Sequence, residues 1–201
     1  SLARQHIRAG GRAVVLEKGI NGDMITIFDN GTHIPLLWTH LIPATLEGKA
    51  LHNVQNAMFA AGLAYCLGKP LDSIQQGLRT FTTTFYQAPG RMNVFDEHNF
   101  RVILDYAHNA DGVRCMSELA SKLEVNGKRI TVLAGPGDRR DEDIANIAKA
   151  AAGHFDIYIC KADDNRRGRG VDEVPQMLAA ALKAEGIKDS QIYCISDEVE
   201  A

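Results

Sequence analysis

The sequence predicts an α/β protein whose second half forms a Rossmann-like, mostly parallel sheet with flanking helices. The main observation is a strict alternation of short β-type apolar runs with amphipathic helical runs. Such alternation is typical of βαβ units built around a largely parallel sheet. We expect strands at residues 130–133, 155–160 and 191–195, and helices at residues 142–152 and 171–185.

The first half carries a different pattern, which predicts a small antiparallel β-meander followed by helices. Asn-Gly-Asp and Asp-Asn-Gly segments, which favour tight turns, separate three short β-type runs, residues 12–16, 24–28 and 33–37. Two helical runs follow at residues 50–67 and 71–81. The second run carries its apolar residues on one face, which indicates core packing.

A domain boundary is expected where the helical pattern ends. Residues 82–90 lack helical periodicity and finish in Pro-Gly, a turn signal. We therefore predict two domains, residues 1–88 and 89–201. Just beyond the boundary, a polar turn joins two β-type runs that are expected to pair antiparallel, residues 92–95 and 101–104.

Composition argues against several classes of function. Among 201 residues, 22 Lys and Arg stand against 25 Asp and Glu, and the net charge of −3 argues against a nucleic-acid groove. No stretch reaches the about 18 apolar residues that a membrane-spanning helix needs. The start of the chain lacks a signal-peptide pattern, and the four cysteines are dispersed without a C-x-x-C pair. We interpret them as buried thiols of a cytoplasmic protein.

The segment Asp105-Tyr106-Ala107-His108-Asn109 is the strongest candidate for a site. An apolar run leads into it and an amphipathic run, residues 111–123, leads out, which predicts a strand, a polar turn and a helix. In open α/β sheets, ligands bind at the carboxyl ends of strands, so the turn offers a carboxylate, an imidazole and an amide to a phosphorylated ligand. The simpler interpretation is that Asp105 caps the next helix and His108 lies on the surface.

Two more polar loops are expected at the same edge, residues 135–141 and 161–169. Both are rich in Asp and Arg, and each follows one of the predicted strands. Clustered charges are usually solvated surface, but three such loops at one edge of one sheet indicate a ligand site.

Three residues earlier in the chain are candidates for nucleotide contacts. Asn53 and Asn56 share one helical face, and an asparagine amide can pair with the N6 and N7 positions of adenine. Capping or surface asparagines are the alternative interpretation. Arg91 follows the Pro-Gly turn at the mouth of a strand, and arginine is well suited to binding phosphate.

The order and spacing of these motifs resemble the Mur ligases, which use ATP to form amide bonds. The resemblance covers the whole chain and rests on four segments: Gly48…His52-Asn53…Asn56-Ala57…Ala60-Ala61, Gly77-Leu78…Phe81, Pro89-Gly90-Arg91 and Asp105 to Asn109. Within the family, the loops at residues 137–144 and 163–169 are most similar to those of the ligases that add arginine to an aspartate polymer. The resemblance implies the end of the central ATPase domain, followed by a truncated carboxy-terminal domain.

The resemblance also implies roles for individual residues. Asn56, with Asn53 beside it, would contact adenine, Asp105 would hold the ribose hydroxyls, and Arg91 would face the phosphates. Arg91 and His108 would be the catalytic residues, because both would lie near the phosphates. Substrate contacts are implied for His108, Asn109, Asp138, Arg139, Asp163, Asp164, Asn165 and Arg166.

The last of these loops is the candidate for choosing the amino acid. In the diaminopimelate-adding Mur ligase, a related Asp-Asn-Pro-Arg run recognises the incoming amino acid, and here Arg166 stands in place of the proline. An arginine substrate would place its guanidinium on Asp163 or Asp164, and its carboxylate on Asn165, Arg166 or Arg167. A solvated surface loop is the alternative interpretation.

The implied chemistry is formation of an acyl-phosphate on a carboxylate, followed by attack of an amine. The expected partners are ATP, Mg²⁺, arginine, an aspartate-backbone acceptor and the rest of the same enzyme, with no nucleic acid and no membrane. The chain lacks a Walker A sequence and the family's metal-binding acids, so no metal ligand is assigned to it and the chain alone is expected to be inactive. The alternatives are another Mur-like ligase, of muramyl-peptide or folylpolyglutamate type, and a non-catalytic scaffold. The sequence leaves open whether the protein is a homo-oligomer.

Overall fold

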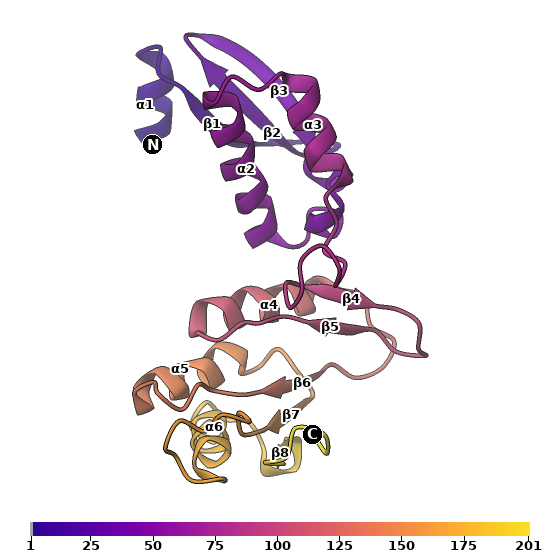
Figure 1. Cartoon of the computed structure of the whole chain (residues 1–201), viewed down its shortest axis with the longest axis vertical. Coiled ribbons are helices and arrows are strands. Elements are labelled where there is room, and N and C mark those ends of the chain that lie inside the picture. The colour runs from indigo at the N-terminus through magenta and orange to yellow at the C-terminus, as the bar shows by residue number, and fades with distance from the viewer. Residues whose placement is uncertain (1) are drawn as a thin grey trace. The chain divides into compact units, whose positions relative to one another are not determined.

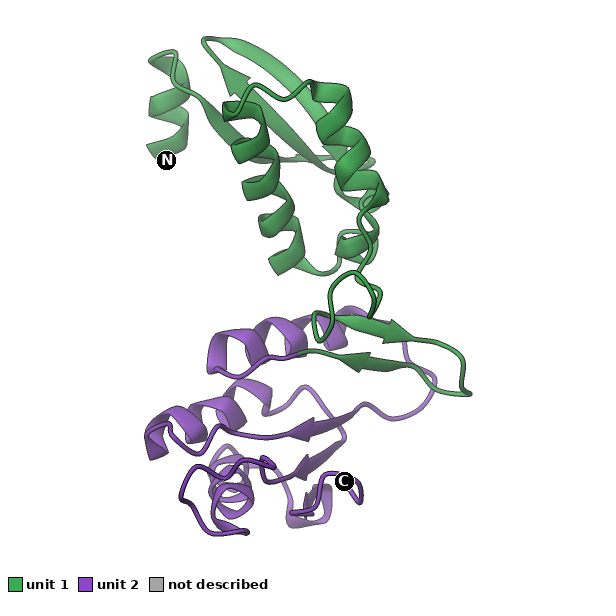
Figure 2. Cartoon of the chain, viewed as in Figure 1, with its two compact units in different colours: residues 1–105 green, residues 106–201 purple. Residues whose placement is uncertain are grey.

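The chain forms two compact units, residues 1–105 and 106–201 (Figures 1 and 2). The computed structural model describes residues 2–201. Each unit has a hydrophobic core of its own. None of the helices in the described residues combines the length and the hydropathy required to cross a bilayer.

The first unit is built on an antiparallel meander in the order β1-β2-β3 (Figure 1). Strand β1 is Ala13–Gly19, β2 is Gly22–Asp29 and β3 is Thr32–Trp38. Between β2 and β3, Asn30 and Gly31 have φ angles of 47° and 80°, as a two-residue type I′ hairpin turn requires. The predicted meander is confirmed, whereas the preceding helix α1, Leu2–Arg8, was not expected.

Two helices pack against the meander and complete the core. They are α2, Leu51–Cys66, and α3, Leu71–Thr80, and both were predicted. Two 3₁₀ turns, Thr39–Leu41 and Pro43–Thr45, connect β3 to α2. The core of this unit consists of Ile25, Ile27, Leu36, Leu37, Ile42, Ala44, Ala57, Ala61 and Ile74. The small side chains among them let α2 lie close to the strands.

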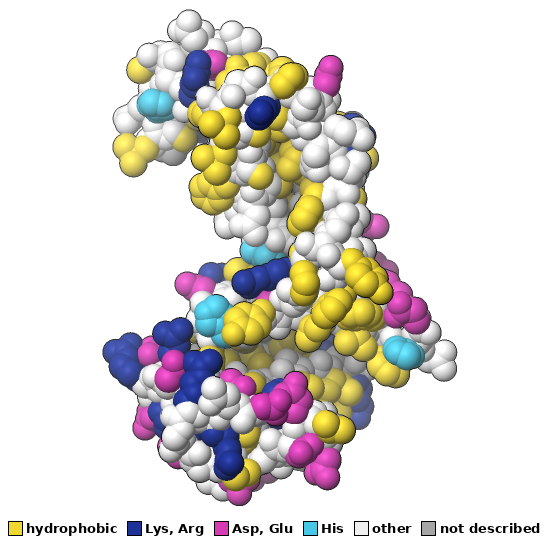
Figure 3. Space-filling model, in the orientation of Figure 1, with side chains coloured by type: hydrophobic (Ala, Val, Ile, Leu, Met, Phe, Trp, Pro, Cys, Tyr) yellow, Lys and Arg dark blue, Asp and Glu magenta, His cyan; other side chains and the backbone are white. Residues whose placement is uncertain are grey.

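An apolar groove of about 630 Å³ lies beside α2. Phe59 and Leu63 line it and are 72% and 68% exposed. Figure 3 shows hydrophobic side chains gathered on this face of the first unit. Arg12 and Tyr65 also line the groove, and both donate hydrogen bonds to Asp29, at 2.8 and 2.9 Å. The groove contains none of the predicted site residues.

Strands β4, Asn93–Phe95, and β5, Val102–Leu104, form the predicted antiparallel ribbon. Within the described residues, β5 pairs with β4 alone and no ladder joins it to another sheet. The prediction that three polar loops follow strands of one sheet is therefore wrong for residues 105–109. A strand pattern does not specify the partner of a strand, and the short polar connection here favours a hairpin.

The second unit contains the predicted parallel sheet, in the order β6-β7-β8. Its strands are Ile130–Leu133, Ile157–Cys160 and Ile192–Cys194. The helices are α4, Ala110–Lys122, α5, Asp141–Ala151, and α6, Glu173–Ala184, and a 3₁₀ turn, Asp189–Gln191, precedes β8. The alternation of helices and strands agrees with the sequence pattern, within about two residues at each end.

The core of the second unit lies between this sheet and its helices. Leu133, Tyr158 and Cys160 are buried against residues of α5 and α6 such as Ile144 and Leu178. The buried Tyr158 hydroxyl accepts hydrogen bonds from the backbone N–H groups of residues 153 and 155, at 2.9 and 3.2 Å. Those bonds hold the turn between α5 and β7.

The interpretation of all four cysteines as buried thiols is wrong. Cys160 is fully buried, and burial raises the pKa of its thiol to about 12. Cys66 and Cys194 are exposed, and Cys115 is half-buried. Cys66 ends α2 and Cys194 lies on the last strand of the sheet, so apolar sequence context alone did not reveal their exposure.

Candidate functional site

In the first unit, the start of α2 carries the two asparagines that were predicted to contact adenine. The Asn53 amide donates to the Ala44 carbonyl at 2.7 Å, and its oxygen accepts a hydrogen bond from the Asn56 amide at 3.1 Å. Asn53 therefore fastens α2 to the preceding 3₁₀ turn. Asn56 is exposed and has a second N–H and a carbonyl oxygen to offer. The adenine contact of Asn56 stays a prediction, and Asn53 orients Asn56.

Asp105, at the end of β5, lies close to the start of α2. One of its oxygens accepts a hydrogen bond from the Met92 backbone N–H at 2.8 Å. Met92 is buried, has a φ of 49°, and places its sulfur 3.7 Å from the Asn53 amide nitrogen. This arrangement links the end of β5 to α2 inside one unit. Asp105 does not cap α4, because Asn109 does so.

His52 is a neighbour of Asp105 that the sequence analysis did not assign. Burial lowers the pKa of the His52 imidazole, and the negative charge of Asp105 partly opposes that shift. The imidazole is therefore neutral at neutral pH. The signals in the sequence were its position directly before Asn53 and its place in the segment that resembles the Mur ligases.

The segment before β4 is held by one buried asparagine. The Asn93 amide donates to the carbonyls of Thr83 and Ala88, at 2.7 and 2.8 Å, and its oxygen accepts from the Gly90 N–H at 2.7 Å. Gly90 has a φ of 68°, which a residue with a side chain rarely adopts. The exposed Arg91 follows directly. Asn93 thus shapes the turn that presents Arg91.

In the second unit, His108 and Asn109 lie on the turn before α4. The Asn109 side chain accepts a hydrogen bond from the Gly112 N–H at 2.8 Å, which makes it the N-cap of α4. The half-buried His108 places Nδ1 3.3 Å from the Tyr106 carbonyl, and the two rings lie 5.3 Å apart. Asn109 therefore has a structural role that the sequence analysis had given to Asp105.

The second and third polar loops meet in this unit. Asp138 and Arg167 form an ion pair at 2.7 Å, and the hydrogen bond from Arg167 lowers the pKa of the Asp138 carboxyl. Gly137 is buried, and a Cβ there would overlap the Arg166 carbonyl, so the backbones approach too closely for any other residue. Arg139 is exposed beside them.

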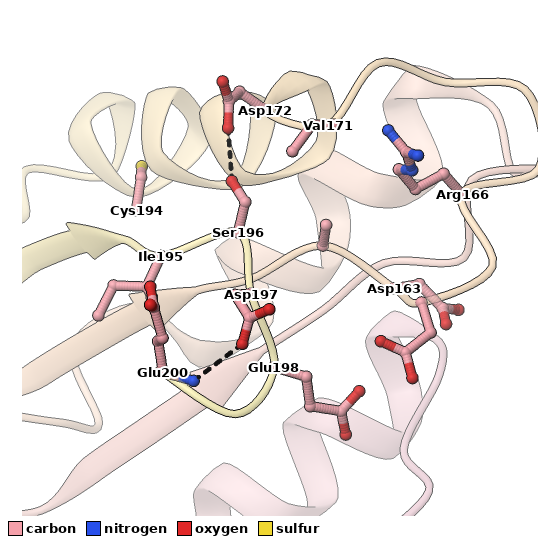
Figure 4. Close-up of a pocket in the computed structure, with 12 residues that line it drawn as sticks. Asp163, Arg166, Val171, Asp172, Cys194, Ile195, Ser196, Asp197, Glu198 and Glu200 are labelled. Carbon is pink, nitrogen blue, oxygen red and sulfur yellow. Dashed lines mark hydrogen bonds between the residues drawn. The ribbon is translucent and has the colours of Figure 1, made fainter.

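A pocket of about 700 Å³ lies at the carboxyl ends of β7 and β8 (Figure 4). Six carboxylates line it, from the loop after β7, the residue before α6 and the turn after β8: Asp163, Asp164, Asp172, Asp197, Glu198 and Glu200. One cation, Arg166, also lines it. The excess of negative charge gives the pocket the electrostatics of a site for a cationic ligand.

The sequence analysis missed four of the six pocket carboxylates, Asp172, Asp197, Glu198 and Glu200. Ser196 donates to Asp172, and Asp197 accepts from the N–H groups of residues 199 and 200, so both acids are held in place. Glu198 forms an ion pair with Lys161, whose Nζ lies 3.0 Å from a carboxylate oxygen of Glu198. Residues 196–200 are far from the third loop in sequence, and the pairing of β7 with β8 brings them beside it. Within the described residues, no three His, Cys, Asp or Glu side chains converge to hold a metal ion.

Comparisons with known proteins place these observations in a family. Residues 90–201 match the family model described as Mur ligase, glutamate ligase domain. The chain is 35% identical over 200 residues to cyanophycin synthetase from Crocosphaera subtropica and 37% identical over 208 residues to that from Trichormus variabilis. All of the chain is covered in both cases, but it spans only 22% of either relative.

More distant relatives and solved structures agree. UDP-N-acetylmuramoyl-L-alanyl-D-glutamate–2,6-diaminopimelate ligase from Caldanaerobacter subterraneus is 31% identical over 160 residues, covering 78% of the chain and 31% of that protein. The fold is similar to Mycobacterium tuberculosis folylpolyglutamate synthase complexed with ADP and AMPPCP, with a TM-score of 0.62, 17% identity, and coverage of 97% of this chain and 42% of that one. The predicted resemblance to the Mur ligases is confirmed. The high identity to cyanophycin synthetases also agrees with the branch of the family that the loops at residues 137–144 and 163–169 indicated.

Replacing Asn109 will separate its capping role from any ligand role. Asn109→Ala is expected to lower the free energy of unfolding by about 1 kcal/mol, because a helix N-cap is lost. Asn109→Asp keeps an accepting oxygen and should unfold at the wild-type denaturant concentration. Equal stability of the alanine variant and the wild type in urea melts would contradict the cap.

The pKa of His52 tests the arrangement around Asp105. Asp105→Asn removes the charge that favours the imidazolium, so the pKa of His52 should fall further, as read by an NMR titration of the labelled imidazole. Since folding favours neutral His52, its contribution to stability is present above about pH 6.5 and is lost as the pH falls toward the folded-state pKa. Asp72→Asn, on the exposed side of α3, is the control and should leave the titration unchanged. If the pKa of His52 is the same in Asp105→Asn as in the wild type, the two groups do not interact.

Proposed function

Because the chain belongs to the Mur ligase family, we propose that it is part of an ATP-dependent ligase that adds arginine to an aspartate-backbone polymer. The observation that carries this proposal is the 35% to 37% identity to cyanophycin synthetases over the whole chain. The reaction joins the amino group of arginine to an aspartate side-chain carboxylate through an acyl-phosphate. Because the chain spans 22% of those relatives, we expect the remaining parts of a longer enzyme to be its main partners.

The nucleotide would be held by residues of the first unit. Asn56 offers an amide to the adenine edge, and Asn53 orients it. The carboxylate of Asp105 accepts hydrogen bonds from ribose hydroxyls, and the guanidinium of Arg91 faces the phosphates. These groups fit a nucleotide because they combine an amide, a carboxylate and a cation. Arg91 would stabilise the charge that develops during phosphoryl transfer.

Mg²⁺ supplies charge neutralisation on ATP phosphates when it is bound. The resemblance to the family implies that the metal-binding acids lie outside this chain. We assign the metal ligands and the phosphate loop to other parts of the longer enzyme, and we expect this chain alone to be inactive.

The amino acid would be bound by the acidic pocket and the loops beside it. Asp163 and Asp164 accept N–H bonds from the guanidinium, and Asn165 and Arg166 hold the α-carboxylate. The other substrate contacts that we propose are His108, Asn109, Asp138 and Arg139. The cap and the ion pair described above orient Asn109 and Asp138, so they would contribute as fixed acceptors.

The division of the chain also forms part of the proposal. We place the domain boundary at residues 88 and 89, beside the Pro-Gly turn, and we propose that it serves as a hinge. The family model begins at residue 90. A cytoplasmic location follows from the proposed nucleotide chemistry, and a homo-oligomer is compatible with it.

A diaminopimelate-type ligase is the second candidate, favoured by the 31% identity over 78% of the chain. The far end of diaminopimelate carries a carboxylate beside an ammonium and has no net charge at neutral pH, so an acidic pocket would attract it less than it attracts a guanidinium. A non-catalytic scaffold would need none of the nucleotide contacts. The longer gene discriminates among the three, because an upstream Walker A sequence and an ATP-grasp module would support the arginine-adding enzyme.

Substitution of the pocket acids tests the choice of amino acid. In the longer enzyme, Asp164→Asn and Asp163→Asn should each raise the KM for arginine by roughly 10- to 100-fold, the scale of one charge-assisted hydrogen bond. The KM for ATP should not change. Glu124→Gln, in an exposed loop between α4 and β6, is the matched control and should behave as wild type. Wild-type arginine kinetics in both aspartate variants would show that this loop does not select the amino acid.

A further inference from the structure

Arg169 occupies an unusual position among the many charged residues of the second unit. Its side chain is only 17% exposed, although it belongs to the polar loop after β7. Its Nε donates to the Gly137 carbonyl at 2.8 Å, and one terminal nitrogen donates to the Arg139 carbonyl and to Asp141, at 2.7 and 2.8 Å. The other terminal nitrogen donates to Glu173 at 2.7 Å. One guanidinium thus joins the loop after β6 to the start of α6.

The contacts of Arg169 differ from the other ion pairs in these loops. The Arg167–Asp138 pair is 38% and 52% exposed, and such surface pairs contribute little. Arg169 instead satisfies two backbone carbonyls of a tight loop, which would otherwise need water or another donor. Glu173 also accepts from the Gly170 N–H at 3.0 Å, so the same carboxylate orders the turn that leads into α6.

The loop that Arg169 fastens is also a wall of the acidic pocket. Asp163, Asp164 and Arg166 precede it in the same loop, and Asp172 follows it at the start of α6. Figure 4 shows these segments around the cavity. Gly137 meets the Arg166 backbone without space for a side chain, so the two loops are in direct contact.

We propose that Arg169 is a positioning residue that clamps the two loops together and thereby sets the spacing of the pocket carboxylates for a cationic amino acid. Arg169 itself touches no substrate. The substrate class rests on the function proposed above, whereas the clamp rests on the contacts alone. Lysine cannot replace it, because one compact ammonium cannot reach four acceptors spread over two segments.

The kinetic test uses the longer enzyme with Arg169→Lys and Arg169→Gln. Both variants should raise the KM for arginine about tenfold, while kcat and the KM for ATP stay within about twofold of wild type. Arg140→Gln is the matched control, because Arg140 directly precedes α5 after the same loop, is 76% exposed and forms its ion pair with Asp143 in its own turn. It should match wild type. Restoration by lysine, or an equal loss in all three constants, would overturn the positioning role.

Hydrogen exchange on the same variants without substrate tests the clamp independently. Arg169→Gln and Arg169→Lys should speed backbone exchange in residues 135–141 and 163–170, and Arg140→Gln should not. Unchanged exchange would overturn the clamp whatever the substrate. If the wild-type enzyme does not use arginine as a substrate but the Arg169 variants still show faster backbone exchange, the proposed function is wrong and the clamp is supported.

Discussion

The parallel register of β7 and β8 is the constraint on which the carboxyl edge of the second unit depends. Cys160 lies opposite Cys194, so the two strands end side by side. The ladder continues beyond the strands, because the Lys161 N–H donates to the Leu133 carbonyl and the Ile195 N–H to the Cys160 carbonyl, at 2.9 and 3.0 Å. The segments that follow therefore leave from adjacent points, and their acidic side chains must share one pocket. Arg169 joins the segment after β7 to the loop after β6 through hydrogen bonds to the carbonyls of Gly137 and Arg139.

The first unit positions the exposed Asn56 amide and the Asp105 carboxylate without a parallel sheet. Hydrogen bonds between side chains and the backbone stabilise the segments that carry them. Asn53 holds the start of α2, Asn93 holds the turn before Arg91, and Asp105 accepts from the Met92 N–H. Each bond joins residues that are distant in sequence or that lie in an irregular segment, where helix and strand ladders supply no support.

The elements were predictable where periodicity is strong, and the site was predictable only in part. The meander and the βαβ alternation follow from apolar spacing that both local preference and tertiary packing favour. The partner of β5, the capping by Asn109 and the exposure of Cys66 and Cys194 depend on tertiary neighbours, which a local pattern does not contain. The same reason explains why Asp172, Asp197 and Glu198 were missed. Asp197 and Glu198 reach the pocket through the strand register, and Arg169 was one of several charged residues in a loop rich in Asp and Arg.

Carboxylate footprinting of the longer enzyme tests the central claim most directly. A carbodiimide and an amine label exposed Asp and Glu side chains, and mass spectrometry reads the labelling of each one. With an ATP analogue bound, arginine should protect Asp163, Asp164 and the acids of residues 197–200, while Glu124 and Asp189 label as before. Free alanine, added as the amino acid instead of arginine, should protect none of these carboxylates. Protection by arginine elsewhere, with these five pocket carboxylates labelled at the unprotected rate, would contradict the assignment of this edge as the amino-acid site.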